Sequence, residues 1–456
     1  MGAVMILFVT EALPLPVTAL LAAALSILLG VAPARTVFAP FADPLIFLFI
    51  GSFMVAQSIE FHKLDKRLAY GVLSNPAVGG HPHRILFAYG LVTAGISAFI
   101  SNTATTAMMF PIGMSLISVL STTQSDTARR ISPAFGMAVM LMASFASTIG
   151  GYATPIGTPT NLLGLGYLKN MEGFELSFFK WVLLALPVVL GMYIFVFLVF
   201  RAATPKDTQD QGDGAAKLQE ERASLGEWTP GQRSTLAAFL LMAVLWITPG
   251  VLALLQGENS PAYQWFREYL PESVIALFGA LLLFILPGGK DAEGKAQRVL
   301  TWKQASGFDW GIIILYGGGV MLGELASQTG LAANIGWCLC DYLPAGGGSW
   351  GLVIAATLIA AAISETTSNT ASVTLVVPVV IHVAHAAGVD PVEPALAATF
   401  ASSLGFMLPV STPCNAMVYS SGHVPITKMI RYGLLLDIFG AVIIAVVVKT
   451  LVPLLR

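Results

Sequence analysis

Long apolar stretches dominate the chain and are separated by short polar loops. Seven of these stretches are long enough, or nearly so, to cross a bilayer as single helices. They fall at residues 17–33, 43–59, 180–200, 234–254, 272–288, 310–325 and 432–454. The pattern predicts an all-α polytopic membrane protein, because a bilayer offers no water to satisfy the backbone of irregular segments.

Four further apolar stretches are interrupted by polar residues or by proline. Residues 85–120 and 349–388 each consist of two shorter arms joined at a Ser-Asn-Thr string, which predicts a re-entrant helical hairpin that enters and leaves the membrane on one side. Residues 132–168 and 391–422 contain proline-rich loops, which predict transmembrane helices broken near their middle. Such backbone at membrane depth is stable only against protein or a water-filled cavity. We therefore expect the four elements to meet at one binding site.

The polar strings recur at fixed offsets along the chain. Ser101-Asn-Thr-Ala104 returns 267 residues later as Ser368-Asn-Thr-Ala371, and the same offset aligns Ser97 with Ser364. The loop from Pro155 to Asn161 returns at an offset of 254 residues, from Pro409 to Asn415. Helix capping alone explains Ser and Asn at helix starts but not this recurrence, so we infer a diverged internal duplication.

The charges of equivalent loops indicate that the two halves have opposite orientations. Residues 59–85 contain four Lys or Arg, whereas the matching residues 326–352 contain none. Cytoplasmic loops are enriched in Lys and Arg. We therefore expect inverted-topology repeats at 1–201 and 234–456, joined by a polar cytoplasmic linker at 202–233.

Composition narrows the chemistry further. Of 456 residues, 56% are hydrophobic and only 11% are charged, with a net charge of −2 and a mean hydropathy of +0.78. This excludes a broad basic surface for nucleic acid and favours the lipid bilayer. The cysteines Cys338, Cys340 and Cys414 lack the spacing of a zinc or disulfide framework. The apolar first ten residues lack the features of a signal peptide and predict part of a helix.

The predicted site can bind an anion without a cationic side chain. No Lys or Arg occurs in residues 85–128, 131–168 or 346–427. Helix N-termini offer oriented N–H groups and partial positive charge. The carbonyl and hydroxyl oxygens of unwound loops are hard ligands that suit Na⁺. We expect anion and Na⁺ to raise the affinity for each other.

The segment from Ser403 to Val418, together with the paired Ser-Asn-Thr strings, resembles the signature of the divalent anion:sodium symporters, a family of di- and tricarboxylate carriers. The resemblance runs from about Val9 to the C-terminus. It implies a first Na⁺ site at Ser97, Ser101, Asn102 and Gly157, and a second at Ser364, Thr367, Asn369 and Ser411. It implies substrate contacts from Asn102, Thr103, Thr158, Asn369, Thr370, Thr412 and Pro413.

The resemblance also implies how the protein works. Family members are homodimers in which a domain built from the hairpins slides against a scaffold, an elevator mechanism. Segments 43–59, 272–288 and 310–325 would belong to the scaffold. The implied function is Na⁺-coupled transport of C4-dicarboxylates such as succinate, fumarate and malate across the bacterial inner membrane, without an organic cofactor and without enzymatic activity. The family usually has one more helix upstream, so this chain is expected to begin within the family's second helix.

Other functions use similar groups. A Na⁺-independent dicarboxylate exchanger, a citrate carrier or a sulfate carrier would need the same hydroxyls and amides. A channel also uses broken helices, although paired hairpins fit alternating access better. An intramembrane enzyme is suggested by Gly347-Gly-Ser349-Trp-Gly351, which matches the nucleophile-elbow pattern, but that pattern requires a preceding strand and a histidine.

Three ionisable residues stand out in the second half. Glu365 adjoins the second Ser-Asn-Thr string and is the one acidic residue expected deep in the site, where it either couples protons or has a hydrogen-bonded structural role. His382 and His385 are spaced to share a helix face, but no third ligand for a metal is visible.

Overall fold

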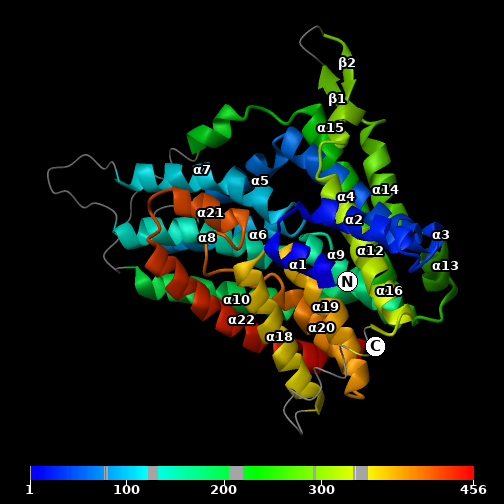
Figure 1. Ribbon diagram of the computed structural model, residues 1–456. Coiled ribbons are helices and arrows are strands. Elements are labelled where there is room, and N and C mark those ends of the chain that lie inside the picture. The colour runs from blue at the N-terminus through cyan, green and yellow to red at the C-terminus, as the bar shows by residue number, and fades with distance from the viewer. Residues whose placement is uncertain are drawn as a thin grey trace.

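The computed structural model in Figure 1 describes residues 2–75, 78, 81–121, 132–204, 219–290, 294–331, 334 and 348–455. Within these residues, eight helical segments are long and apolar enough to cross a membrane: Ala34–Phe61, Pro133–Gly151, Phe178–Ala203, Pro230–Gln256, Trp310–Gln328, Gly348–Thr366, Asn369–Ala386 and Ile426–Leu455. The expectation of an all-α polytopic membrane protein is therefore confirmed.

All seven predicted segments are helical. They are α2 (Leu15–Leu28), α4 (Pro44–Phe61), α10 (Phe178–Ala203), α12 (Pro230–Gln256), α14 (Glu272–Leu283), α16 (Trp310–Gln328) and α22 (Ile426–Leu455). Five of them are among these eight, whereas the segments near 17–33 and 272–288 form helices of 14 and 12 residues that are not. The segment expected at 272–288 ends earlier, at Leu283, because the chain continues into a strand that contains Pro287 and two glycines. The apolar N-terminus forms α1 (Gly2–Thr10), as its sequence predicts.

The sequence did not reveal several short elements. Strand β1 (Pro287–Lys290) pairs with β2 (Ala296–Arg298) as an antiparallel hairpin that extends from the helices in Figure 1. The short helices are α3 (Ala34–Phe38), η1 (Ala39–Ala42), α5 (Leu64–Leu73), α13 (Pro261–Tyr269) and α15 (Trp302–Ala305). None of these elements is longer than ten residues, which is less than the roughly 11–18 residues over which a hydrophobic period is recognised.

Each Ser-Asn-Thr string lies where one helix ends and the next begins. Helix α6 (Pro82–Ser97) is followed by α7 (Asn102–Ser121), and α18 (Gly348–Thr366) by α19 (Asn369–Ala386). The hydroxyl of Ser101 accepts a hydrogen bond from the Ala104 N–H at 3.3 Å, and Ser368 accepts one from Ala371 at 3.3 Å. The two serines therefore cap α7 and α19 in the same way. Entry and exit on one side of the membrane stays a prediction.

The two proline-rich loops interrupt helices as expected. Helix α8 (Pro133–Gly151) is followed by α9 (Pro159–Glu172), and α20 (Val392–Ala401) by α21 (Pro413–Ser420). Thr158 precedes α9 with φ −143° and ψ 145°, and Thr412 precedes α21 with φ −145° and ψ 147°. The proline that follows each threonine occupies the first helical position, where its missing N–H costs nothing.

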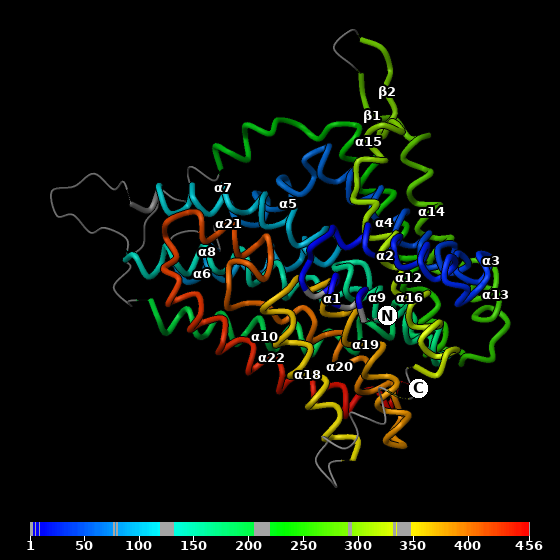
Figure 2. Tube along the Cα trace, viewed as in Figure 1, coloured from blue at the N-terminus to red at the C-terminus, as the bar shows by residue number. Residues whose placement is uncertain are grey.

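The two halves of the chain interlock. Helix α21 packs against α7 and α8, and α9 packs against α19, α20 and α16; Figure 2 shows the group of α7, α8 and α21. Each broken helix thus contacts the hairpin of the other half. Elsewhere α4 lies on α14 so closely that a Cβ at Gly51 would come within 2.4 Å of the Ala276 carbonyl carbon.

Residues 225–227 of the expected linker are attached to the first half. The Arg67 guanidinium of α5 donates hydrogen bonds to the carbonyl oxygens of Leu225, Gly226 and Glu227 at 2.8, 2.9 and 3.1 Å. Residues 205–218 of the linker lie outside the described residues.

Candidate functional site

The first hairpin tip is held by two residues that the sequence singles out. The hydroxyl of Ser97, at the buried end of α6, donates to Asn102 Oδ1 at 2.8 Å. The same oxygen lies against the end of α8, where a Cβ at Gly151 would come within 2.4 Å of it. A side chain at position 151 would therefore displace the Asn102 amide where the tip of the first hairpin meets the first broken helix.

The first broken loop brings carbonyl oxygens to this tip. A Cβ at Gly157 would lie 2.6 Å from the carbonyl oxygen of Gly151 and 3.0 Å from that of Ala98. The Thr154 hydroxyl donates to the same Ala98 carbonyl. Ser97, Asn102 and Gly157, three of the four residues expected at the first Na⁺ site, thus lie in one oxygen-rich cluster.

The second tip repeats this arrangement. Ser364 Oγ lies 2.8 Å from Asn369 Oδ1 and 2.7 Å from the Ser402 carbonyl oxygen. The hydroxyl has a single hydrogen, which it can donate to either of these two acceptors. A Cβ at Gly405 would meet Asn369 Oδ1 at 3.1 Å, Ser364 Oγ at 3.3 Å and Ser411 Cβ at 3.3 Å. Three of the four residues expected at the second Na⁺ site therefore surround Gly405.

Ser101 and Thr367, the fourth residue of each expected site, make contacts close to them in sequence. Ser101 is exposed and caps α7. The Thr367 hydroxyl donates to the Ile363 carbonyl of α18 at 2.8 Å.

The expected substrate contacts occupy the starts of four helices. Thr103 follows Asn102 in the first turn of α7. Thr370 lies in the first turn of α19, and Thr374 donates to its carbonyl oxygen at 2.8 Å. Thr158 is buried before α9, and the Thr160 hydroxyl approaches it at 3.4 Å. Thr412 caps α21 by accepting from the Asn415 N–H at 3.1 Å, and Pro413 is exposed beside it.

Two asparagines close the broken loops, a role that the sequence did not assign. Asn161 Nδ2 donates to the carbonyl oxygens of Gly151 and Thr154, both at 2.8 Å. Asn415 Nδ2 donates to those of Gly405 and Leu408 at 2.8 and 3.0 Å. The sequence contained a signal for this role, because each asparagine is an amide side chain in an apolar segment at the matched offset. The structure shows that both are buried.

Glu365 is fully engaged in hydrogen bonds. Its Oε1 accepts from the Met407 N–H at 2.7 Å, and its Oε2 accepts from the Leu408 N–H at 3.3 Å and the Ser411 hydroxyl at 2.7 Å. The expectation that it is the one acidic residue deep in this region is wrong. Asp437 of α22 is also buried, because Gly433 and Gly440 allow that helix to approach the second broken loop at Phe406 and Leu404.

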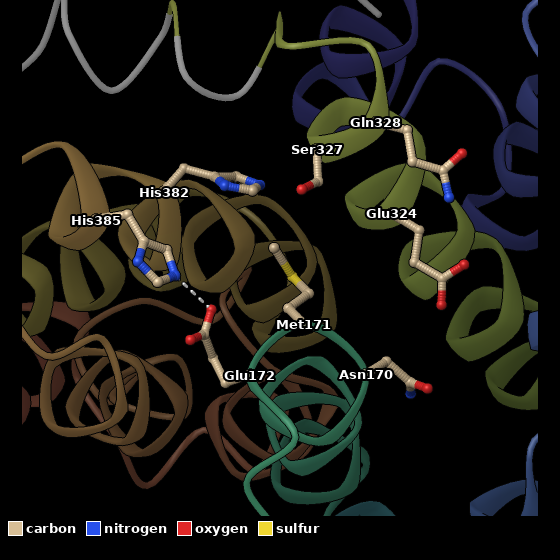
Figure 3. Close-up of a pocket in the computed structure, with 8 residues that line it drawn as sticks. All are labelled: Asn170, Met171, Glu172, Glu324, Ser327, Gln328, His382 and His385. Carbon is tan, nitrogen blue, oxygen red and sulfur yellow. Dashed lines mark hydrogen bonds and ion pairs between the residues drawn. The ribbon is translucent and has the colours of Figure 1, made fainter.

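His382 and His385 line a cavity of about 300 Å³ between the C-terminal ends of α9, α16 and α19, shown in Figure 3. His385 Nε2 lies 2.8 Å from Glu172 Oε1. Among the described residues, no group of three or more His, Cys, Asp or Glu could hold a metal ion. His382 lies 13 residues beyond Asn369, about 20 Å along α19, so this cavity is separate from the hairpin tips.

Ser349, the nucleophile of the alternative enzyme hypothesis, lies in the first turn of α18. Its hydroxyl donates to Glu393 Oε2 at 2.6 Å and accepts from Lys449 Nζ at 2.7 Å. These contacts join α18 to α20 and α22. Gly347 of the elbow pattern lies outside the described residues, as do Cys338 and Cys340; Cys414 is a buried free thiol.

Solved transporter structures share the fold. The YdaH transporter of Alcanivorax borkumensis aligns with a TM-score of 0.62 and 14% identity, over 94% of this chain and 88% of that one. MtrF of Neisseria gonorrhoeae, described as illuminating a class of antimetabolite efflux pumps, aligns with a TM-score of 0.59 and 14% identity, over 93% and 83%. At this identity the likeness establishes the fold alone.

Curated relatives are much closer in sequence. The sodium-dependent dicarboxylate transporter SdcS of Staphylococcus saprophyticus is 32% identical over 448 residues, which cover 98% of this chain and 84% of the relative. SdcS of Staphylococcus aureus is 31% identical over the same shares. The family model described as the sodium:sulfate symporter transmembrane region matches residues 1–455 of this chain. The protein is therefore a multi-pass protein of the bacterial plasma membrane and belongs to the sodium:sulfate symporter family, the divalent anion:sodium symporters.

Proposed function

We propose that this protein carries C4-dicarboxylates across the membrane together with Na⁺. The observation that carries the proposal is the matched pair of oxygen-rich clusters, one at each hairpin tip, in segments without Lys or Arg. The names of both staphylococcal relatives, sodium-dependent dicarboxylate transporters, agree with it.

Each cluster is proposed to bind one Na⁺. In the first, oxygens of Ser97, Ser101, Asn102 and the loop at Gly157 would coordinate the ion. In the second, the corresponding groups belong to Ser364, Thr367, Asn369 and Ser411. Hydroxyl, amide and carbonyl oxygens are hard, neutral ligands, so they suit a monovalent alkali cation better than a transition metal.

The dicarboxylate is proposed to bind between the two tips. Asn102 and Thr103 would contact one carboxylate and Asn369 and Thr370 the other, with Thr158, Thr412 and Pro413 shaping the surrounding loops. Four helices begin at these residues, and their N-termini favour anions. Because the hairpins and broken helices contain no Lys or Arg in residues 85–128, 131–168 and 346–427, bound Na⁺ would supply the remaining positive charge and couple the two ligands.

The movement is proposed to be of the elevator type, within a homodimer of two inverted repeats per chain. The scaffold would contain α4, α14 and α16. Two observations support this division. Helix α4 packs closely on α14 at Gly51, which favours a rigid scaffold. Each broken helix packs against the hairpin of the other half, which favours movement of the four site elements as one body.

Uptake of radiolabelled succinate into proteoliposomes tests the proposal. An inward Na⁺ gradient is compared with an equal K⁺ gradient, with citrate and sulfate as competitors. Accumulation driven by Na⁺ and blocked by unlabelled dicarboxylate is the expected result. Uptake that ignores Na⁺ but requires internal dicarboxylate would instead identify an exchanger, and stronger competition by citrate or sulfate would reassign the substrate.

A further inference from the structure

Glu11 is an isolated charge in an apolar part of the chain. It is the only charged side chain in residues 1–34, and it lies, exposed, in the turn between α1 and α2. A charge in an apolar membrane segment is costly and therefore a candidate functional residue. Among the described residues, no Lys, Arg or His forms an ion pair with it. The reason for its presence must lie in another contact.

The Glu11 carboxylate reaches the tip of the second hairpin. Its Oε1 accepts a hydrogen bond from the Ser368 N–H at 3.2 Å, across 357 positions of the chain. Ser368 is the cap of α19, and its own hydroxyl accepts from the Ala371 N–H. The first amides of a helix lack partners within it and carry its partial positive charge. Glu11 therefore brings a carboxylate from a distant element to the positive end of α19.

The backbone of Glu11 adopts a conformation that is uncommon for a residue with a side chain. Its φ is 47°, and Lys63 is the only other non-glycine residue with a positive φ in the part of the chain that the structure describes. Such a left-handed conformation is unfavourable outside glycine, and an outlier of this kind indicates a functional constraint. The position of the Glu11 side chain is thus maintained against a local backbone preference.

Packing on both sides holds this turn in place. Before it, α1 packs against α19, and Phe8 and Leu375 belong to one buried cluster (Figure 1). After it, α2 lies on α16 so closely that a Cβ at Gly318 would come within 2.5 Å of Ala19 Cβ. The turn therefore connects α16, part of the proposed scaffold, with the second hairpin, part of the proposed moving body.

The helix end that Glu11 contacts is also where a substrate carboxylate is proposed to bind. Asn369 and Thr370, the residues assigned to that carboxylate, directly follow Ser368. Two carboxylates close together repel each other. Each also reduces the stabilisation that the other gains from the positive end of the helix. Glu11 and a bound substrate would therefore oppose each other at this tip.

We propose that Glu11 is an internal competitor of the substrate. Its carboxylate occupies the positive end of α19 when no substrate is bound, and a substrate carboxylate displaces it. Displacement releases the tip of the second hairpin from the turn between α1 and α2, so the empty hairpin is held and the loaded hairpin is free to move. This inference rests on the proposed function, because it requires a carboxylate substrate at this tip.

The concentration dependence of succinate uptake at saturating Na⁺ tests the competition. Glu11→Gln keeps an oxygen that can accept from the Ser368 N–H but removes the charge, whereas Glu11→Ala removes both. The KM for succinate should fall about threefold to tenfold in Glu11→Gln and at least as much in Glu11→Ala. The control is Asp309→Asn, which neutralises the carboxylate that caps α16 and should keep the wild-type KM. A purely structural role of Glu11 would lower the maximal rate and leave KM unchanged.

Hydrogen–deuterium exchange measures the displacement itself. Adding succinate to the wild type in Na⁺ should increase exchange in the peptide that covers the turn, residues 9–15. In Glu11→Ala, exchange in this peptide should already be high without succinate and should not increase when succinate is added. Exchange in the turn that succinate leaves unchanged in the wild type would contradict displacement.

The two measurements separate this inference from the proposed function. An unchanged KM in Glu11→Gln overturns the inference, as does a raised half-saturating Na⁺ concentration at constant KM, which would mean that Glu11 attracts the cation. Absence of Na⁺-driven succinate uptake in every protein, the wild type included, contradicts the proposed function instead. Thermal stabilisation by citrate or sulfate then decides: the stabilising anion should act at lower concentration in Glu11→Gln, and equal concentrations, or no stabilisation by either anion, overturn the inference.

Discussion

Asn161 and Asn415 lie 254 residues apart and make the same pair of bonds, each closing a broken loop onto two carbonyl oxygens. Both side chains are buried. They differ in one respect: Asn415 Oδ1 accepts from the Ser144 hydroxyl at 2.6 Å, whereas Asn161 Oδ1 has no partner among the described residues. The second loop is thus fastened by one more hydrogen bond than the first.

Replacing either asparagine by alanine should destabilise the protein and abolish succinate uptake. Each substitution leaves two carbonyl oxygens without their donor, at a cost of about 1–3 kcal/mol for each one that is buried. Asn415→Ala should cost more than Asn161→Ala because it also strands the Ser144 hydroxyl. Thermal unfolding in detergent and uptake in proteoliposomes measure the two effects. The control is Asn170→Ala, which removes one bond within α9; equal losses in all three variants would contradict this account.

A side chain at Gly157 should weaken Na⁺ binding more than protein stability. In Gly157→Ala the new Cβ would approach the carbonyl oxygens of Gly151 and Ala98 at 2.6 and 3.0 Å. The loop must shift, and a strain of about 1–3 kcal/mol corresponds to a rise of about fivefold to about 140-fold in the half-saturating Na⁺ concentration. The control is Gly95→Ala on α6, where a Cβ meets nothing within 4 Å. An unchanged Na⁺ dependence in Gly157→Ala would remove Gly157 from the cation site.

The sequence predicted the elements that have a strong pattern. Apolar length located the seven single helices, and repeated strings located the turns of the hairpins and the broken loops, because polar residues in an apolar segment must have a local structural reason. Contacts between distant elements were not predictable in this way. Asp437 lies in what the sequence shows as an ordinary transmembrane helix, and only the packing of Gly433 and Gly440 against Phe406 and Leu404 buries it at the second broken loop.

Stability should fall as pH rises through the range in which Asp65 ionises. Burial raises the pKa of Asp65 from 3.8 to about 6 in α5, outside the predicted membrane spans. The folded state therefore holds a proton that the unfolded chain releases near pH 4, and stability present at low pH is lost as pH rises to about 6. The loss amounts to about 3 kcal/mol.

Asp65→Asn isolates this contribution, because asparagine stays neutral at every pH. Thermal unfolding at about pH 4 and about pH 7 should show a smaller decrease in the variant than in the wild type. The exposed Asp309→Asn serves as control and should keep the wild-type decrease. A variant that loses stability as steeply as the wild type would place the responsible group elsewhere.

Lys449 and Glu393 should behave as a pair that tolerates joint replacement better than the loss of one member. Their Nζ and Oε2 atoms are 2.5 Å apart, and both side chains are nearly buried. Lys449→Met leaves Glu393 as an uncompensated buried charge, which costs about 3–5 kcal/mol. Adding Glu393→Gln to that variant should restore much of the stability, because a neutral amide still pairs with the Ser349 hydroxyl.

The comparison is Lys180→Met, which breaks a more exposed pair with Glu258 and should cost no more than about 1 kcal/mol. If the double variant is as unstable as Lys449→Met alone, the lysine acts through its packing over the Trp350 ring rather than through its charge.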